Sequence, residues 1–335
     1  MKPSELTIVI EKCMKAKKPL IIKGAPGIGK TKIISKVAKD NGYKGFFIDT
    51  AISSPTDFKG IPMYNRDTDT ASFKPYDILL EMIDAKEPTL VFFDDFGLAT
   101  PAVQGSLMHL LSERRVGDHH ISDHVTFMLA MNEQKQNAGV GMTLEPVKSR
   151  CVSIVGLEPD VEDWLNWGFQ NNLHPHVLGF IRWRPKMLWS FQPTNDLTNS
   201  PSPRTNEHVS NILEMKLPWA IEYELIEGAA GSGYATEFSA YKKMAENIVS
   251  LDHIISNPKT AEVPKEPSVL YAMTTALAYR ANKQNLASLL EYSERMPEEF
   301  RLKFVEYDIP SRNESLKETE EYNTWIVKHQ ELIKN

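Results

Sequence analysis

The chain has few cysteines and no long apolar run. Its 335 residues include two cysteines, Cys13 and Cys151, which lie far apart and outside any metal-binding motif. Two isolated cysteines provide neither a disulfide framework nor a thiolate cluster for a metal, which favours a reducing, cytoplasmic environment. No apolar run approaches the length of a membrane span, and charged residues interrupt the short apolar run near the N-terminus. We therefore expect neither membrane insertion nor a signal peptide.

The chain also lacks an excess of positive charge. Its formal net charge is -6, so no global basic field attracts nucleic acid, although a local basic patch remains open. Internal repeats and low-complexity tracts are absent as well. The hydrophobic fraction of 41% and the charged fraction of 24% are typical of a globular protein, and the length predicts two domains or one large domain.

One stretch, residues 24–31, carries a complete motif, G-x-x-x-x-G-K-[ST], which is the phosphate-binding loop of nucleotide triphosphatases. An apolar strand over 20–22 enters it, and a helical run over 32–38 leaves it. Glycines let backbone N–H groups curl around phosphate oxygens, and the N-terminus of the helix adds positive potential. We expect Lys30 to reach the β- and γ-phosphates of ATP and the Thr31 hydroxyl to bind Mg²⁺. The predicted nucleotide-binding residues are Gly24, Ala25, Pro26, Gly27, Ile28, Gly29, Lys30, Thr31 and Lys32.

Polar side chains end two further predicted strands. The apolar run 89–93 is followed by Asp94 and Asp95, and the run 125–130 leads to Asn132. Open parallel sheets bind ligands at the carboxyl ends of their strands. We expect Asp94 to hold Mg²⁺ directly or through water and Asp95 to orient and polarise the attacking water. The amide of Asn132 is placed to hydrogen-bond the γ-phosphate and that water.

Two other segments of the first half have a distinctive composition. Residues 53–75 form a turn-rich connection that is long for a βα unit, and long connections are often functional. Residues 113–121 predict a hairpin. Its histidines, with His124, lie in a polar turn without companion carboxylates or thiols, which favours a solvated hairpin over a metal site.

The composition changes after residue 157, where strand patterns give way to amphipathic helical ones. The predicted helices span 160–171, 174–182, 204–216, 218–227, 234–256, 267–280 and 282–293. The glycine-rich stretch 228–233 is interpreted as a flexible connector and 257–267 as a linker. Within the charged tail 311–335 we expect a docking helix.

The ordered set of motifs resembles the AAA+ ATPases, and among them the MoxR-like group, over roughly residues 1–255. In this resemblance residues 24–31 are Walker A, Asp94 and Asp95 end Walker B, and Asn132 is sensor 1. Arg150, before the fifth strand, resembles the arginine finger, and Arg204 resembles sensor 2. The resemblance implies an αβα core with a five-stranded parallel sheet of order 5-1-4-3-2, followed by an all-helical lid. The implied domains are 1–157 (nucleotide-binding domain), 158–257 (lid) and 258–335 (C-terminal helical extension).

The resemblance also implies a function. Such proteins form homo-oligomeric rings, usually hexamers, in which Arg150 would act in trans on the ATP of a neighbouring copy. Hydrolysis would then remodel or activate a protein client, in the manner of a chaperone, often with a von Willebrand factor A-like partner. One residue departs from the family pattern, because Asp95 stands where Glu is usual and its carboxylate is one methylene shorter. This predicts slow hydrolysis. Arg114 and Arg115 are alternative trans fingers.

Two other functions stay open on the sequence. A DNA-dependent AAA+ helicase loader or translocase would need a basic pore, for which the candidate residues are Lys59, Arg66, Lys74, Arg114 and Arg115. A non-hydrolysing, ATP-gated scaffold would bind nucleotide without turnover. The client, the ring size and the role of 258–335 are not indicated by any motif.

Overall fold

The computed structural model describes the chain except for residues 68, 133–144, 191–197, 247–249 and 334–335. It divides into two compact units, Met1–Glu158 and Pro159–Asn335. The prediction that the second unit consists of a lid and a separate extension stays a prediction. Within the described residues, no helix is long and apolar enough to cross a membrane.

The first unit alternates strands and helices. Its elements are α1 (Pro3–Lys15), β1 (Leu20–Lys23), α2 (Lys30–Asp40), β2 (Lys44–Asp49), α3 (Thr56–Lys59), β3 (Ile61–Asn65), β4 (Thr70–Lys74), α4 (Ile78–Ile83), β5 (Thr89–Asp94), η1 (Phe96–Leu98), α5 (Pro101–Glu113), β6 (Arg115–Val116), β7 (His119–His120), β8 (Val125–Met131), α6 (Glu145–Lys148) and β9 (Ser153–Gly156).

The five-stranded sheet has the order β2-β5-β8-β1-β9, and all of its pairs are parallel. In chain order this is 2-3-4-1-5, so the predicted fold class is confirmed. The central strands β5 and β8 are almost wholly buried, as expected for a parallel sheet covered on both faces. Their polar residues therefore come at the strand ends, which is where the candidate site lies.

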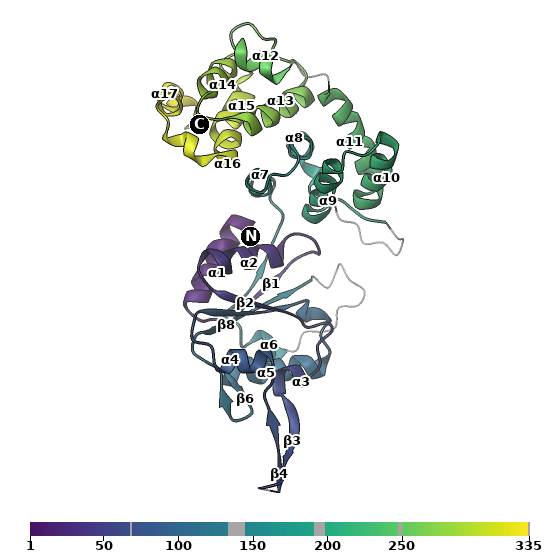
Figure 1. Cartoon of the computed structure of the whole chain (residues 1–335), viewed down its shortest axis with the longest axis vertical. Coiled ribbons are helices and arrows are strands. Elements are labelled where there is room, and N and C mark those ends of the chain that lie inside the picture. The colour runs from purple at the N-terminus through teal and green to yellow at the C-terminus, as the bar shows by residue number, and fades with distance from the viewer. Residues whose placement is uncertain (68, 133–144, 191–197, 247–249, 334–335) are drawn as a thin grey trace. The chain divides into compact units, whose positions relative to one another are not determined.

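Helices cover both faces of this sheet (Figure 1). On one face, Val91 and Phe93 of β5 pack in a core with residues of α3, α4, α5 and α6. The alternate residues of the same strand, Leu90 and Phe92, are equally buried on the other face, which α1 and α2 cover. The sheet is thus the middle layer of an αβα sandwich.

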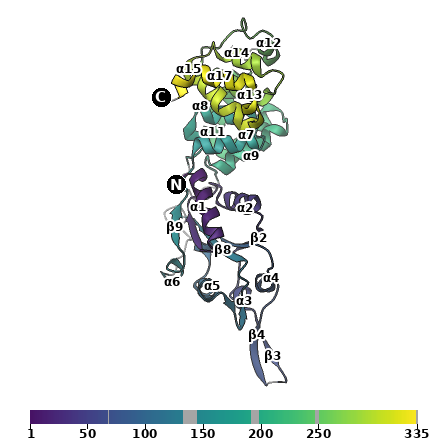
Figure 2. The same ribbon diagram turned by 90° about the vertical axis from the view of Figure 1, so that its left-hand side faces the viewer.

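The segment expected to be a turn-rich connection contains the antiparallel hairpin β3–β4, which extends away from the body of the first unit (Figures 1 and 2). Four of its large apolar side chains are 45–61% exposed, namely Ile61, Met63, Tyr64 and Phe73. The shorter predicted hairpin is present as β6–β7.

The second unit contains helices and connecting segments, with no strand among its described residues. Its elements are α7 (Val161–Gln170), α8 (Pro175–Trp183), η3 (Pro185–Met187), α9 (Pro203–Glu214), α10 (Trp219–Ala230), α11 (Ser232–Ala245), α12 (Leu251–Ser256), α13 (Pro267–Arg280), α14 (Leu286–Ser293), α15 (Glu298–Leu302), the π-helix η4 (Lys303–Asp308), α16 (Ile309–Arg312), η5 (Glu314–Glu318), α17 (Glu320–Lys328) and α18 (Gln330–Ile333).

One hydrophobic core runs through this unit, from Trp164 in α7 to Trp325 in α17. The buried Trp325 and Tyr322 attach α17 to that core, where a docking helix was expected. The prediction of a flexible connector over residues 228–233 was wrong. Helix α10 continues through Ala230, α11 begins at Ser232, and Gly231 alone breaks the run with a φ of +91°.

Two neighbouring histidines at the start of α8, His174 and His176, give the helical unit a pH dependence. Their ring centroids are 4.9 Å apart, and burial lowers the pKa of each to about 4, with the charge of Lys242 acting in the same direction. The carboxylates of Glu222 and Glu246 raise the pKa of His176, but burial and the neighbouring positive charges lower it by more.

Because the pKa of each ring is lower in the folded protein than in the unfolded chain, acid destabilises the fold. Each histidine contributes about 1–3 kcal/mol to the free energy of unfolding. This contribution is fully present above pH 6.5 and is lost as the pH falls towards 4. Followed by circular dichroism, the unfolding temperature of the wild type should fall more steeply over this interval than that of His176→Gln, in which His174 keeps its share. Asp308, whose pKa burial raises to about 6, acts in the opposite direction in both proteins. A change at the exposed His208 should leave the wild-type dependence as it is.

Candidate functional site

The predicted phosphate loop lies between β1 and α2. Gly27 and Gly29 have φ angles of +77° and +101°, a region that L side chains adopt only at a cost. Nothing lies within 4 Å of a Cβ placed on Gly29, so its backbone conformation alone requires glycine. Gly24 also requires glycine, but because of close contacts and not because of its backbone conformation.

Gly24 is in close contact with the end of the first unit. A Cβ at this position would come within 2.5 Å of the Ile28 side chain and 2.9 Å of the Leu157 carbonyl oxygen. The Leu157 backbone N–H in turn donates a 2.8 Å hydrogen bond to the carbonyl of Lys23. The loop is therefore packed against the segment that leads out of β9.

Lys30 is 7% exposed, and its ammonium group is held at the loop. Nζ donates hydrogen bonds to the carbonyl oxygens of Gly24 (2.9 Å) and Ala25 (3.0 Å) and to Oδ1 of Asn132 (2.8 Å). The structure thus brings together two residues that are 102 positions apart in the sequence. A cation fixed by three acceptors is oriented before any phosphate arrives.

Asp94 and Thr31 also meet. The Thr31 hydroxyl donates to Oδ2 of Asp94 over 2.6 Å, while Oδ1 of Asp94 accepts from the backbone N–H of Asp95. These two residues are the predicted Mg²⁺ ligands. Within the described residues, no group of three His, Cys, Asp or Glu side chains is arranged to bind a metal. Such a small donor set fits Mg²⁺, which is usually held by one or two carboxylates together with substrate phosphates and water.

Asp95 has a left-handed backbone, with φ +48° and ψ +33°. Its Oδ1 accepts a 3.0 Å hydrogen bond from Nδ2 of Asn132, so the amide joins Asp95 to Lys30. Burial raises the pKa of Asp95, and the neighbouring charges of Asp94 and Asp49 add to the effect. The Lys30 charge and the hydrogen bond from Asn132 partly oppose the increase. A more basic carboxylate is a better acceptor for a proton from water.

Two residues that the sequence analysis did not single out contribute to this edge of the sheet. Thr50 is fully buried, and both its backbone N–H (3.1 Å) and its hydroxyl (2.7 Å) donate to the carbonyl oxygen of Asp94. Asp49, at the end of β2, is paired in register with Asp94. The only sequence signal for either residue is its place directly after an apolar strand.

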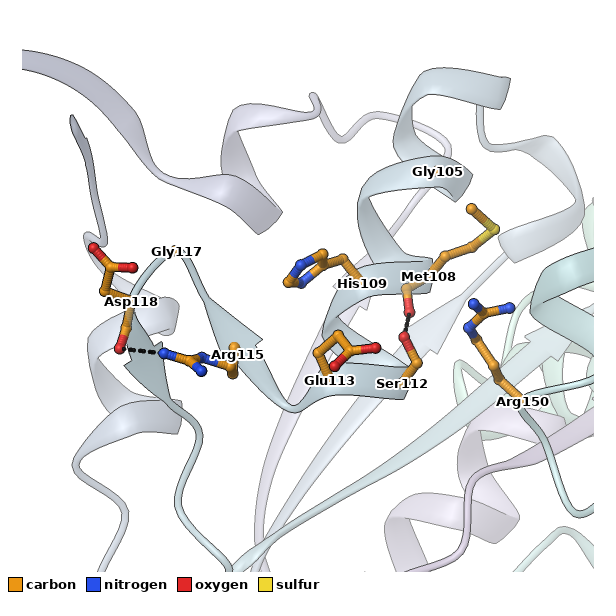
Figure 3. A pocket seen from close by; sticks show the side chains of 9 residues that line it. All are labelled: Gly105, Met108, His109, Ser112, Glu113, Arg115, Gly117, Asp118 and Arg150. Carbon is orange, nitrogen blue, oxygen red and sulfur yellow. Dashed lines mark hydrogen bonds between the residues drawn. The ribbon is translucent and has the colours of Figure 1, made fainter. Parts of the chain in front are cut away.

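The three candidate finger arginines have different surroundings. Arg114 is partly buried at the base of the β6–β7 hairpin, where it donates to the carbonyls of Ser122 and Val125 (2.8 and 2.9 Å). Arg115 and Arg150 instead line one open cavity of about 560 Å³ (Figure 3). Arg114 is therefore committed to holding the hairpin, and the cavity leaves the other two as candidates.

Helix α5 forms the floor of this cavity, with Met108, His109 and Ser112 between the two arginines (Figure 3). Arg150 donates a 2.6 Å hydrogen bond to the carbonyl of Pro146, and Arg115 donates to that of Asp118 over 3.2 Å. No residue of the phosphate loop is among the described residues that line it.

Arg204 lies in the helical unit, in the first turn of α9. Ser202 caps this helix, since its hydroxyl accepts from the Thr205 backbone N–H, and Pro203 occupies the first helical position. The Arg204 side chain is exposed. Its contact with nucleotide stays a prediction.

Comparison with known proteins gives one family. The family model for an AAA domain of the dynein-related subfamily matches residues 19–151. No curated protein matches. A RuvB variant from Thermotoga maritima has a TM-score of 0.41 at 12% identity, covering 82% of this chain and 80% of that one. A candidate ATPase from Cytophaga hutchinsonii has a TM-score of 0.36 at 13% identity, covering 97% and 88%. Similarities this low indicate nothing about activity, whereas the matched family and the observed sheet together support an AAA+ P-loop ATPase.

Proposed function

We propose that this chain, whose first unit is an AAA+ P-loop domain, is a MoxR-like ATPase that hydrolyses ATP in an oligomeric ring to remodel or activate a protein partner. The observation that carries the proposal is the hydrogen-bonded series from Lys30 through Asn132 to Asp95, next to the Thr31–Asp94 pair. A cation, an amide, a basic carboxylate and a Mg²⁺-binding pair are the parts that phosphoryl transfer to water requires.

Each group has a role in the proposed reaction. The backbone of the phosphate loop and Lys30 bind the phosphates of ATP. Asn132 orients the γ-phosphate and the attacking water, and Asp95 accepts the proton of that water as its oxygen attacks phosphorus. Thr31 and Asp94 would hold Mg²⁺, which would neutralise charge on the phosphates. The products are ADP and inorganic phosphate.

The site is completed by another copy of the chain. Arg150 would enter from a neighbouring subunit and stabilise the charge that develops on the transferred phosphoryl group. This assignment is supported by the open cavity that Arg150 lines, apart from its own phosphate loop. Arg204 would report the state of the nucleotide to the helical lid.

The client surface is assigned to the hairpin β3–β4. Its four exposed apolar side chains are costly in water unless a partner covers them, and the hairpin extends away from the body of its unit (Figure 2). A projecting element with apolar side chains is suited to gripping an exposed apolar segment of another protein. A partner with a von Willebrand factor A-like domain is the class that the MoxR resemblance favours.

Client capture tests this function. We expect the tagged Asp95→Asn protein, incubated with ATP and Mg²⁺, to retain a partner from a lysate of its own source, identified by mass spectrometry. Retention should disappear with ADP, because the client is bound in the ATP state. It should also fall at least tenfold in the Asp95→Asn protein that carries Met63→Ser and Tyr64→Ser, since these changes remove exposed apolar area and, within the hairpin, only the hydrogen bond from Tyr64 to Asp69.

A partner that is retained equally with ADP, or equally by the hairpin variant, would contradict the client role. For the nucleic-acid alternative, Arg114 is the least accessible of the five basic residues, because its guanidinium donates to the carbonyls of Ser122 and Val125. Stimulation of the ATPase by DNA at low salt would nevertheless favour that alternative.

A further inference from the structure

The last residue of β2, Asp49, lies beside Asp94 on the same face of the sheet. The two residues are paired in register, and the pair two positions earlier, Phe47 and Phe92, has its rings in contact with centroids 5.6 Å apart. Side chains of paired residues in parallel strands point to the same face, and adjacent strands are about 4.8 Å apart. The Asp49 carboxylate is therefore directed to the face where Asp94 meets Thr31.

The end of β2 is fixed at this point. The two hydrogen bonds from Thr50 to the Asp94 carbonyl continue the pairing one residue beyond Asp49. The Asp49 side chain is itself oriented, because Oδ1 accepts a 3.0 Å hydrogen bond from the Ala51 backbone N–H. Within the described part of the chain, Oδ2 has no such partner. The side chain is exposed, so water reaches it freely.

Asp94 already accepts a hydrogen bond from the protein at each carboxylate oxygen, which reduces what it offers to the water ligands of a cation. Oδ2 accepts from Thr31 and Oδ1 from the backbone of Asp95. Mg²⁺ gives up its water reluctantly and keeps several water ligands in protein sites. Those waters need acceptors, and a carboxylate on the adjacent strand is placed to supply them.

We propose that Asp49 is a positioning residue for the divalent cation that accompanies ATP, and that it accepts hydrogen bonds from the water ligands of that cation. This inference rests on the proposed function of the Thr31–Asp94 pair. In this proposal Asp49 does not bind the metal directly. Groups that support a metal through its ligands typically change its affinity by about 10–100-fold. Because Asp49 is exposed, we expect a smaller effect, of about 3–10-fold.

The test measures binding of a divalent cation without turnover. Mn²⁺ is titrated into the full-length protein that holds a non-hydrolysable ATP analogue, and free Mn²⁺ is followed by electron paramagnetic resonance. Asp49→Asn should weaken Mn²⁺ about 3–10-fold while nucleotide affinity without metal stays the same. Asparagine keeps the acceptor for Ala51, so the turn after β2 is retained. Asp49→Glu keeps the charge and should bind Mn²⁺ within about threefold of the wild type.

Two further variants distinguish a failure of the role of Asp49 from a failure of the proposed function. Asp40→Asn removes an exposed carboxylate that pairs with Lys36 on α2, and it should leave Mn²⁺ affinity unchanged. Thr31→Ala removes a proposed ligand and should weaken Mn²⁺ more than any change at Asp49. Wild-type affinity in Asp49→Asn together with weak binding in Thr31→Ala would overturn the role of Asp49 and leave the proposed function standing. If the wild type itself shows no nucleotide-dependent Mn²⁺ binding, both proposals fail.

Discussion

Arg150→Ala lowers the turnover number at saturating ATP by about 10³-fold, while the affinity for ATP stays close to that of the wild type. A trans arginine contacts the phosphoryl group mainly as charge develops in the transition state, so its loss reduces kcat rather than ground-state binding. Turnover is measured by phosphate release and affinity by fluorescent nucleotide binding. Arg115→Ala is the matched control, because Arg115 lines the same cavity and is bound to its own hairpin.

A mixing experiment tests whether the arginine acts in another copy. Lys30→Ala has no functional ATP site but an intact Arg150, whereas Arg150→Ala has the reverse defect. Each protein alone should be inactive. Their mixture should regain ATPase activity, because some interfaces then combine an intact loop with an intact arginine. If the mixture stays inactive although mixed oligomers form, or if Arg115→Ala is the more damaged single variant, the assignment of Arg150 is wrong.

Asp95→Asn should lower turnover by at least about 10²-fold and leave both folding and ATP affinity intact. An amide cannot take the proton of the attacking water. The replacement is otherwise conservative, because asparagine tolerates the left-handed backbone at this position and still offers an oxygen to Nδ2 of Asn132. Single-turnover hydrolysis and a thermal unfolding curve measure the two properties separately.

The pH dependence of the wild type gives a second readout for the same residue. Burial and the charge of Asp94 raise the pKa of Asp95, so the rate should begin to fall, on acidification, at a pH above the ordinary range of an aspartate. Hydrolysis by Asp95→Asn at a rate close to the wild type would show that another group accepts the proton. The non-hydrolysing scaffold would be favoured if the wild type binds ATP and does not turn it over.

Asp95 also shows where the sequence was informative and where it was not. The apolar run before Asp94 predicted both the strand and the place of the two carboxylates at its end. The left-handed backbone of Asp95 could not be predicted, yet it gives a physical reason for the departure from the usual Glu. Aspartate and asparagine are enriched in this conformation because their short polar side chains bond locally.

Other features depend on tertiary contacts and had no sequence signal. The hairpin β3–β4 lies in a segment that was interpreted as a turn-rich connection because of its serine, proline, aspartate and glycine residues. The glycines at 228 and 233 were interpreted as flexible, but packing of α10 and α11 retains both inside helices. Nothing in the sequence distinguished Arg114 from Arg115. In the structure Arg114 donates to the carbonyls of Ser122 and Val125, whereas Arg115 lines the open cavity.

The contact between Gly24 and Leu157 has a mechanical consequence. The phosphate loop and the segment that leaves the sheet are joined at one point, by the hydrogen bond from Leu157 to Lys23 and by the space that a missing Cβ leaves at Gly24. Leu157 stands two residues before Pro159, where the helical unit starts. A displacement of Gly24 would therefore act on Leu157, close to the start of that unit in the sequence.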